Sequence, residues 1–147
     1  MKRIFFVCIA VIMTFVLCAS CAKKFSPSIK LKSDSVTSID FKKTVFGEER
    51  QYKQKTVTEA SDIKEICNWL TSLRLTKHDA IEIPVEKISY TIIINGTKQH
   101  RVLFMEEYII FNNTAYTFNK PADKDTVIGK YNLLNYTETD TKLGLIS

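Results

Sequence analysis

The stretch Lys87–Glu106, KISYTIIINGTKQHRVLFME, predicts a β-hairpin and sets the fold class. Two runs rich in β-branched and aromatic residues flank Asn95-Gly96, and this dipeptide between such runs is a strong hairpin signal. Alternation along the first run places one set of large apolar side chains on the same face, namely Ile88, Tyr90, Ile92 and Ile94. The pattern favours a strand pair with one buried face.

The expected register of this hairpin is the one that places apolar side chains of both strands on the same face. A strict two-residue turn would place Arg101 opposite Tyr90 and would bury a charged side chain. A slip of one residue moves every side chain to the other face. We therefore expect a three-residue loop or a bulge, with Ile88 opposite Phe104 and Tyr90 opposite Val102.

Three further segments have strand patterns. Val36–Phe46 alternates apolar Ile39 and Phe41 with polar residues, which indicates a half-buried strand. Gln51–Val57 is more polar and lysine-rich, as in edge strands, where lysines discourage unwanted pairing. Tyr108–Phe118 predicts two strands with a turn at or near Asn112-Asn113, and Thr76–Pro84 is expected to be a loop.

A helix is predicted after the second strand. Thr58 is the expected cap, and Glu59 and Asp62 suit the first turn, where the helix dipole favours acids. Apolar residues recur at helical spacing and predict a buried stripe, with Trp69 half-buried at its edge: Ile63, Ile66, Cys67, Leu70 and Leu73. In this stripe Cys67 is interpreted as a small buried apolar residue.

A second, short C-terminal helix is predicted within Asp123–Tyr136. Val127, Ile128, Tyr131 and Leu134 have helical spacing, although Gly129 weakens the pattern. The predicted fold class is α+β, with one main helix packed on an antiparallel β-sheet and this short helix in addition. The opposite sheet face or a strand edge would remain free for a partner.

The N-terminus has the features of a secretory signal peptide. Met1-Lys2-Arg3 is basic, and an apolar run from Ile4 to Leu17 precedes small residues. Two alternatives are an uncleaved transmembrane helix, which needs about 20 apolar residues, and ordinary cleavage after Ala22 without a lipid.

The sequence CASC, Cys18–Cys21, resembles the lipobox of bacterial lipoproteins. The resemblance implies that Cys21 carries a diacylglyceryl group and that the signal is cut just before it, with Ala19 and Ser20 as the small residues in front. Cys18 stands where the family usually has Leu. The expected organisation is a signal peptide over 1–20, a lipidated tether over 21–34 and a single α+β domain over 35–147.

This resemblance implies a location on the cell membrane, facing outside the cytoplasm, with the membrane itself as a partner through the lipid anchor. The element order is similar to that of small uncharacterised lipoproteins of low-GC Gram-positive bacteria. It is also similar to helix-on-sheet inhibitor modules such as β-lactamase-inhibitor-like domains. Both resemblances rest on element order alone. The anchor, together with a domain that has no catalytic constellation, is what leads us to expect a binding or inhibitor-like role toward an envelope or extracellular protein or ligand.

Composition and motifs argue against several other functional classes of protein. The formal net charge is only +5, and no Arg cluster or basic-aromatic interleaving suggests nucleic acid. The two histidines, His78 and His100, have no HxxxH or CxxC context, so no metal site is expected. GxSxG, P-loop and GxGxxG motifs are absent, and no cofactor is expected.

Two functional hypotheses follow. The preferred one is a non-catalytic, lipid-anchored binding or inhibitor-like module. The alternative is a small cell-envelope enzyme that uses His78, Asp79 and His100, which would require these side chains to converge in one cleft. Glu106-Glu107 is interpreted as a polar turn, because adjacent strand residues point to opposite faces.

Overall fold

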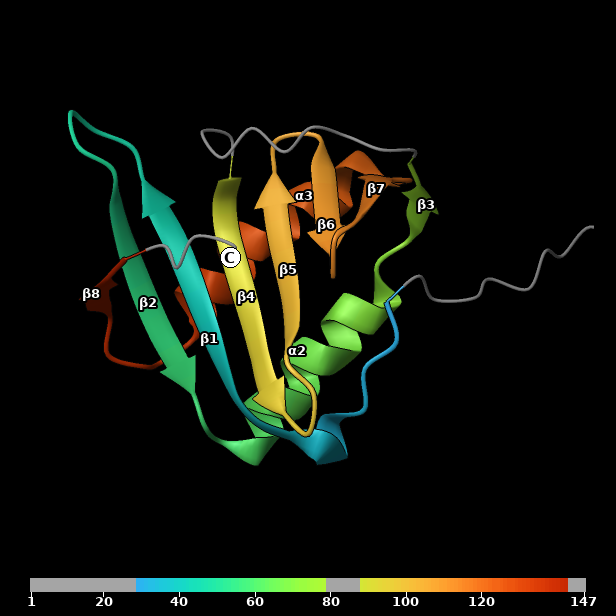
Figure 1. The fold of residues 1–147 in the computed structure, drawn as a ribbon, viewed down its shortest axis with the longest axis horizontal. Coiled ribbons are helices and arrows are strands. Elements are labelled where there is room, and N and C mark those ends of the chain that lie inside the picture. The colour runs from blue at the N-terminus through green and yellow to red at the C-terminus, as the bar shows by residue number, and fades with distance from the viewer. Residues whose placement is uncertain (1–28, 79–87, 143–147) are drawn as a thin grey trace, which may run out of the picture.

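An eight-stranded antiparallel sheet dominates the fold in the computed structural model, which describes residues 29–78 and 88–142 (Figure 1). The strand order is β3-β7-β6-β5-β4-β1-β2-β8. The strands are β1 Val36–Val45, β2 Gln51–Val57, β3 Leu75–Lys77, β4 Ile88–Gly96, β5 His100–Met105, β6 Tyr108–Phe111, β7 Thr114–Phe118 and β8 Thr139–Thr141. The α+β class with an antiparallel sheet is confirmed.

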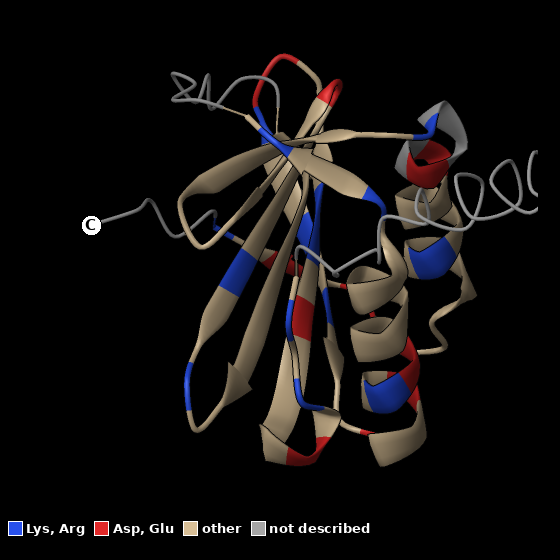
Figure 2. Cartoon of the chain, turned by 90° about the vertical axis from the view of Figure 1, so that its right-hand side faces the viewer, with Lys and Arg blue, Asp and Glu red and all other residues tan. Residues whose placement is uncertain are grey.

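The balance of elements differs from the expected single main helix. The helices α2, Ala60–Ser72, and α3, Pro121–Leu133, each have 13 residues, and a 3-10 turn, η2, spans Ser33–Ser35. Both helices lie on the same side of the sheet (Figure 2). The sheet needs two helical covers because it is wider than one 13-residue helix can protect.

Helix α2 buries the stripe that its sequence predicts. Ile63, Ile66, Cys67, Leu70 and Leu73 are all buried, and Trp69 is half-buried. These side chains belong to the main core cluster, together with apolar residues of the central strands. The helical period therefore identified the covering face correctly.

The predicted cap of α2 was wrong. The N-cap residue is Glu59 rather than Thr58, and its side chain forms no capping bond. The hydroxyl of Tyr136 lies there instead: it accepts a hydrogen bond from the Glu59 N–H, at 3.2 Å, and donates one to Asp62, at 2.8 Å. A side chain distant in sequence thus satisfies the helix start, which local sequence rules do not consider.

Helix α3 docks through Val127 and Tyr131, which are 5% and 1% exposed. Lys55 of β2 donates to the carbonyl oxygens of Tyr131, at 3.0 Å, and Leu134, at 2.7 Å, and so caps the C-terminus of α3 with a positive charge. Ile128 was expected in the buried stripe, but it is 49% exposed because it lies to one side of the contact with the sheet.

Three residues, Thr97 to Gln99, separate β4 from β5, but the last pair of the hairpin is Ile94 with His100, which encloses a longer loop than expected. Tyr90 pairs with Phe104 and Ile92 with Val102, two residues from the predicted register. A shift of two keeps the same side chains on the same face, so the predicted face is right for Tyr90, Ile92 and Ile94. A register irregularity between Ile88 and Tyr90 places Ile88 in the smaller cluster with Met105, so the predicted face was wrong for Ile88. The register moves because Gly96 stays in β4, where it pairs with Val36 of β1.

The β6–β7 turn is confirmed at Asn112 and Asn113, whose φ angles are 46° and 66°. Both positive angles suit the two-residue turns that join twisted strands. Two peripheral strands were not expected. The short β8 pairs with Tyr52–Gln54, so β2 is not the outermost strand, and β3 takes Thr76 and Lys77 from the predicted loop.

The core lies between the sheet and the two helices, around Ile39, Phe41, Ile92 and Ile94, each fully buried. Ile29, from the range expected to be tether, is also in this core at 1% exposure. A second, smaller cluster comprises Ile88, Leu103, Met105, Ile110 and Ala115, with Tyr108 packed against it. These side chains are buried too, so this part of the opposite face is not open as expected.

Candidate functional site

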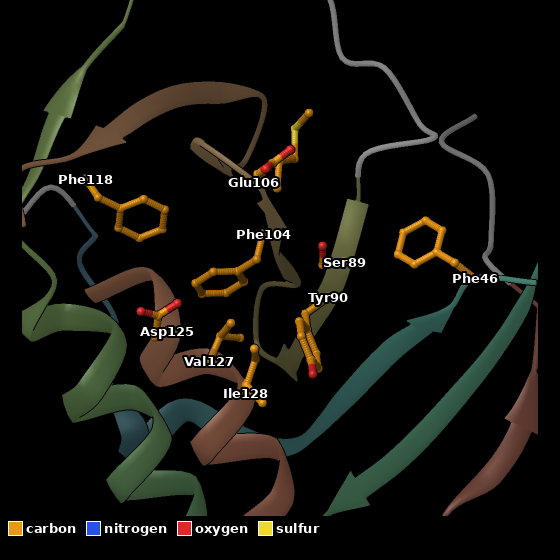
Figure 3. Close-up of a pocket in the computed structure, with 10 residues that line it drawn as sticks. Phe46, Ser89, Tyr90, Phe104, Glu106, Phe118, Asp125, Val127 and Ile128 are labelled. Carbon is orange, nitrogen blue, oxygen red and sulfur yellow. The ribbon is translucent and has the colours of Figure 1, made fainter. Parts of the chain in front are cut away.

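A cavity of about 390 Å³ opens between α3 and one end of the sheet (Figure 3). It is lined by Phe46 after β1, Ser89 and Tyr90 of β4, Phe104 and Met105 of β5, Glu106 of the next turn, Phe118 of β7, and Asp125, Val127 and Ile128 of α3. Its volume lies within the range of about 300–1,000 Å³ that is usual for ligand pockets.

The inner wall of the cavity is aromatic and held in place by packing. Phe104 is 2% exposed and stacks between Trp69, at 5.6 Å between ring centroids, and Phe118, at 6.4 Å. Tyr90 is 7% exposed and contacts the ring of Tyr131 at 5.6 Å. Because these rings are fixed by their neighbours, the wall is preorganised and does not need to reorder when a ligand enters.

The rim combines exposed apolar and acidic side chains. Phe46 and Ile128 are 56% and 49% exposed, which is unusual for side chains of this size. Glu106 and Asp125 are exposed carboxylates, and neither forms an ion pair within the described parts of the chain. No lysine or arginine is among the described residues that line this cavity. The formal charges of the described lining residues are therefore all negative.

This arrangement can hold an apolar group that carries a positive charge. Aromatic faces attract cations through their quadrupole, and carboxylates add a direct electrostatic attraction. Burial raises the pKa of the Tyr90 hydroxyl, so this side of the wall stays neutral at physiological pH.

The two predicted histidines lie on opposite faces of the sheet. The ring of His78 contacts Tyr108 at 5.7 Å, and Tyr108 belongs to the smaller apolar cluster away from the helices. His100 stacks on Phe111 at 5.6 Å, and Phe111 packs against the main core on the helix side. The structure therefore does not bring His78 and His100 together, and Asp79 lies outside the described residues.

Other side chains singled out from the sequence also fall in separate places. Glu106 and Glu107 form the turn between β5 and β6, as expected, and only Glu106 reaches the cavity. Tyr108 and Tyr131 pack in different clusters. Cys67 is a free, buried thiol whose pKa is raised by burial, in agreement with a packing role. Cys21 lies outside the described residues.

Sequence reasoning missed the cavity because its walls come from segments far apart in the chain. Phe104, Phe118 and Val127 each carry an ordinary core pattern in their own element. One signal was available: Phe46 is a large apolar residue directly before the polar GEER stretch.

Within residues 29–78 and 88–142, no three His, Cys, Asp or Glu side chains are placed to hold a metal ion. No helix of those same residues is both long and apolar enough to cross a membrane. Comparisons with protein-family models, curated proteins and solved structures find no match to this chain.

Proposed function

We propose that this protein is a lipid-anchored, extracytoplasmic binding module, and that the aromatic cavity beside α3 is its ligand site. The observation that supports the proposal is the cavity itself: rigid rings form the inner wall, and exposed Phe46 and Ile128 form an apolar rim. Exposed apolar side chains around a concave site are typical of surfaces that a partner covers.

The ligand class follows from the charges at the rim. Glu106 and Asp125 favour a ligand that places a cation beside its apolar part, such as a protein or peptide segment with a lysine or arginine next to a large apolar residue. Anchorage through Cys21 would present this site to envelope or extracellular partners. An inhibitor-like module would use the same cavity to hold a side chain of its target.

The test uses the single tryptophan as a reporter. Trp69 stacks on Phe104, so a ligand that enters the cavity changes the tryptophan emission. We expect phenethylamine to produce a saturable change, and phenylpropionate, which has a similar body and the opposite charge, to produce little. Equal responses to the two probes would contradict the proposed charge selectivity.

Matched variants distinguish binding in the cavity from non-specific hydrophobic binding elsewhere on the surface. Ile128→Glu should weaken the response by blocking the apolar rim, and Asp125→Asn should weaken it for the amine alone. Leu133→Glu is the control, because Leu133 is 80% exposed on the same helix and does not line the cavity. If Leu133→Glu reduced the response as much as Ile128→Glu, the cavity would not be the site.

A further inference from the structure

A second cavity, of about 480 Å³, lies at the other end of β5. There the β4–β5 loop meets the segment that leads into β1, as the ribbon in Figure 1 shows. It is lined by Lys30, Leu31, Lys32, Ser35, Val36, Thr71, Thr97, Lys98 and His100. Three lysines and a histidine thus surround it, and no carboxylate is among the described lining residues. We call it the basic cavity.

The lysines of the basic cavity have no acidic partner in the described parts of the chain. Lys30, Lys32 and Lys98 are exposed, and neither of the recorded ion pairs involves them. They come from two segments more than sixty residues apart, and β1–β4 pairing brings those segments together. Converging cations without a counter-charge form a region of positive potential suited to an anion.

The orientation of His100 adds a neutral donor to this cavity. The backbone N–H of Arg101 donates to Asn112 Oδ1, at 3.0 Å, which fixes the orientation of the Asn112 amide. The amide nitrogen must then donate to His100 Nδ1, at 2.7 Å. Nδ1 is therefore an acceptor, and the ring proton lies on Nε2. His100 lines the cavity, and among the described residues its Nε2–H has no hydrogen-bond partner.

We propose that the basic cavity binds a phosphate group. A phosphate monoester carries a charge of about −1.5 to −2 near neutral pH. A phosphodiester, such as a lipid headgroup, is a monoanion. Both have strong acceptor oxygens, which match multiple lysine ammonium groups and one N–H donor. A lone carboxylate would use only part of this donor set. The hydroxyls of Thr71 and Thr97 also line the cavity and can complete the hydrogen bonding.

The phosphate can belong to a soluble phosphate ester or to a lipid headgroup. Lys30 follows Cys21 by nine residues, which span at most ~30 Å when extended. If Cys21 is anchored as proposed, headgroup phosphates are within reach of the cavity. The phosphate site itself does not depend on that anchor.

The experiment titrates the full-length chain, in neutral detergent micelles, with inorganic phosphate at constant ionic strength. The imidazole nitrogen signals of His100 are followed by NMR, and Nε2 should shift saturably while the Nδ1 contact to Asn112 persists. The double variant Lys30→Gln/Lys98→Gln should bind about tenfold more weakly or worse, because two charge-assisted contacts are lost. The matched control is Lys64→Gln/Lys120→Gln, which removes the same charge from exposed lysines outside the cavity.

Equal weakening in the two double variants, or no saturable shift at His100, would overturn the proposal. His100→Phe is a further check, since it keeps a ring to stack on Phe111 and removes the donor. It should weaken phosphate binding several-fold, measured at the Lys98 signal. A second titration uses micelles doped with phosphatidylglycerol: a response at the same signals assigns the lipid source, and a response to phosphate alone assigns the soluble one.

Discussion

Gly96 shows how one residue can be required by packing rather than by a turn. Asn95-Gly96 was interpreted as a hairpin turn, but Gly96 lies in β4, and no described glycine has a positive φ. A Cβ on Gly96 would lie 2.0 Å from the carbonyl oxygen of Ser35, so the absent side chain allows β1 and β4 to approach. The same carbonyl accepts the N–H of Thr97, at 3.2 Å, and this bond holds the start of the loop.

Gly96→Ala should therefore lower the free energy of unfolding by about 1–3 kcal/mol, as other overpacking changes do. Gly129→Ala is the matched control in α3, because a Cβ there meets nothing within 4 Å. That change should raise stability by about 0.5–1 kcal/mol, since alanine is the better helix former. Urea melts of a chain beginning at Ser26 measure both, and a stabilising Gly96→Ala would contradict the close approach.

Tyr131 predicts a loss of stability at alkaline pH. Burial, together with a hydrogen bond to Glu138 at 2.8 Å, raises the pKa of its hydroxyl above the usual 10.0. The folded state therefore holds the proton of this hydroxyl more tightly than the unfolded chain does. Its contribution to the free energy of unfolding is complete below pH 10 and is lost as the pH rises beyond it.

The free energy of unfolding, measured from pH 8 to pH 11, should therefore fall at the alkaline end. The fall should be shallower in Tyr131→Phe, which has no hydroxyl to ionise. Tyr90, 5.6 Å away, contributes in the same direction because burial raises its pKa as well. Tyr52→Phe on β2 is the control, and an unchanged slope in Tyr131→Phe would refute the assignment.

At the scale of elements, the two helices are attached to the sheet in different ways. Helix α2 buries a continuous apolar stripe, whereas α3 buries Val127 and Tyr131 and receives Lys55 at its C-terminus. The Lys55 ammonium also lies 4.8 Å from the Tyr131 ring centroid, in cation–π contact. Since α3 uses few apolar contacts, a gap remains between this helix and one end of the sheet, and that gap is the aromatic cavity.

Leu70→Ala tests the contact of α2 with the sheet. Leu70 is fully buried, so its truncation should cost roughly 2–5 kcal/mol. Lys64→Ala on the exposed side of the same helix should change stability by less than about 0.5 kcal/mol. The free energies of unfolding from urea melts should therefore differ clearly between the two variants. Equal, small changes would mean that α2 does not cover the sheet.

At the scale of the whole molecule, two cavities of opposite character lie at opposite ends of β5. The aromatic cavity has an acidic rim, and the basic cavity has three lysines and no described carboxylate. Two binding sites of different charge on one rigid sheet would allow a partner and a phosphate group to be held at the same time. The proposed anchor would determine where both sites face.

Cys21→Ala tests that anchor. Unprocessed precursor should accumulate in the membrane, and detergent-phase partitioning of the mature protein should be abolished. Cys18→Ala should leave processing intact, because bulky Leu17 would precede a cut at that cysteine. An unmodified mature chain beginning at Lys23, observed by mass spectrometry, would exclude the lipid and leave export standing.

Local patterns were sufficient for the elements that carry a strong period. The 3.6-residue stripe of α2, the alternation in β1 and β4 and the Asn112-Asn113 turn depend on neighbouring residues, so each was predictable from its own segment. The buried position of Cys67 followed from the same stripe. These features are consequences of side-chain periodicity and backbone preference.

Only the tertiary structure decided the register at Gly96, the Tyr136 cap of α2, the outer strands β3 and β8, and both cavities. Each depends on contacts between segments far apart in the chain: Ser35 with Gly96, Glu59 with Tyr136, and β5 with α3 or with the segment before β1. Sequence patterns describe which face of an element is apolar. They do not specify which distant element covers it or where a covering helix leaves a gap, and here those gaps are the candidate sites.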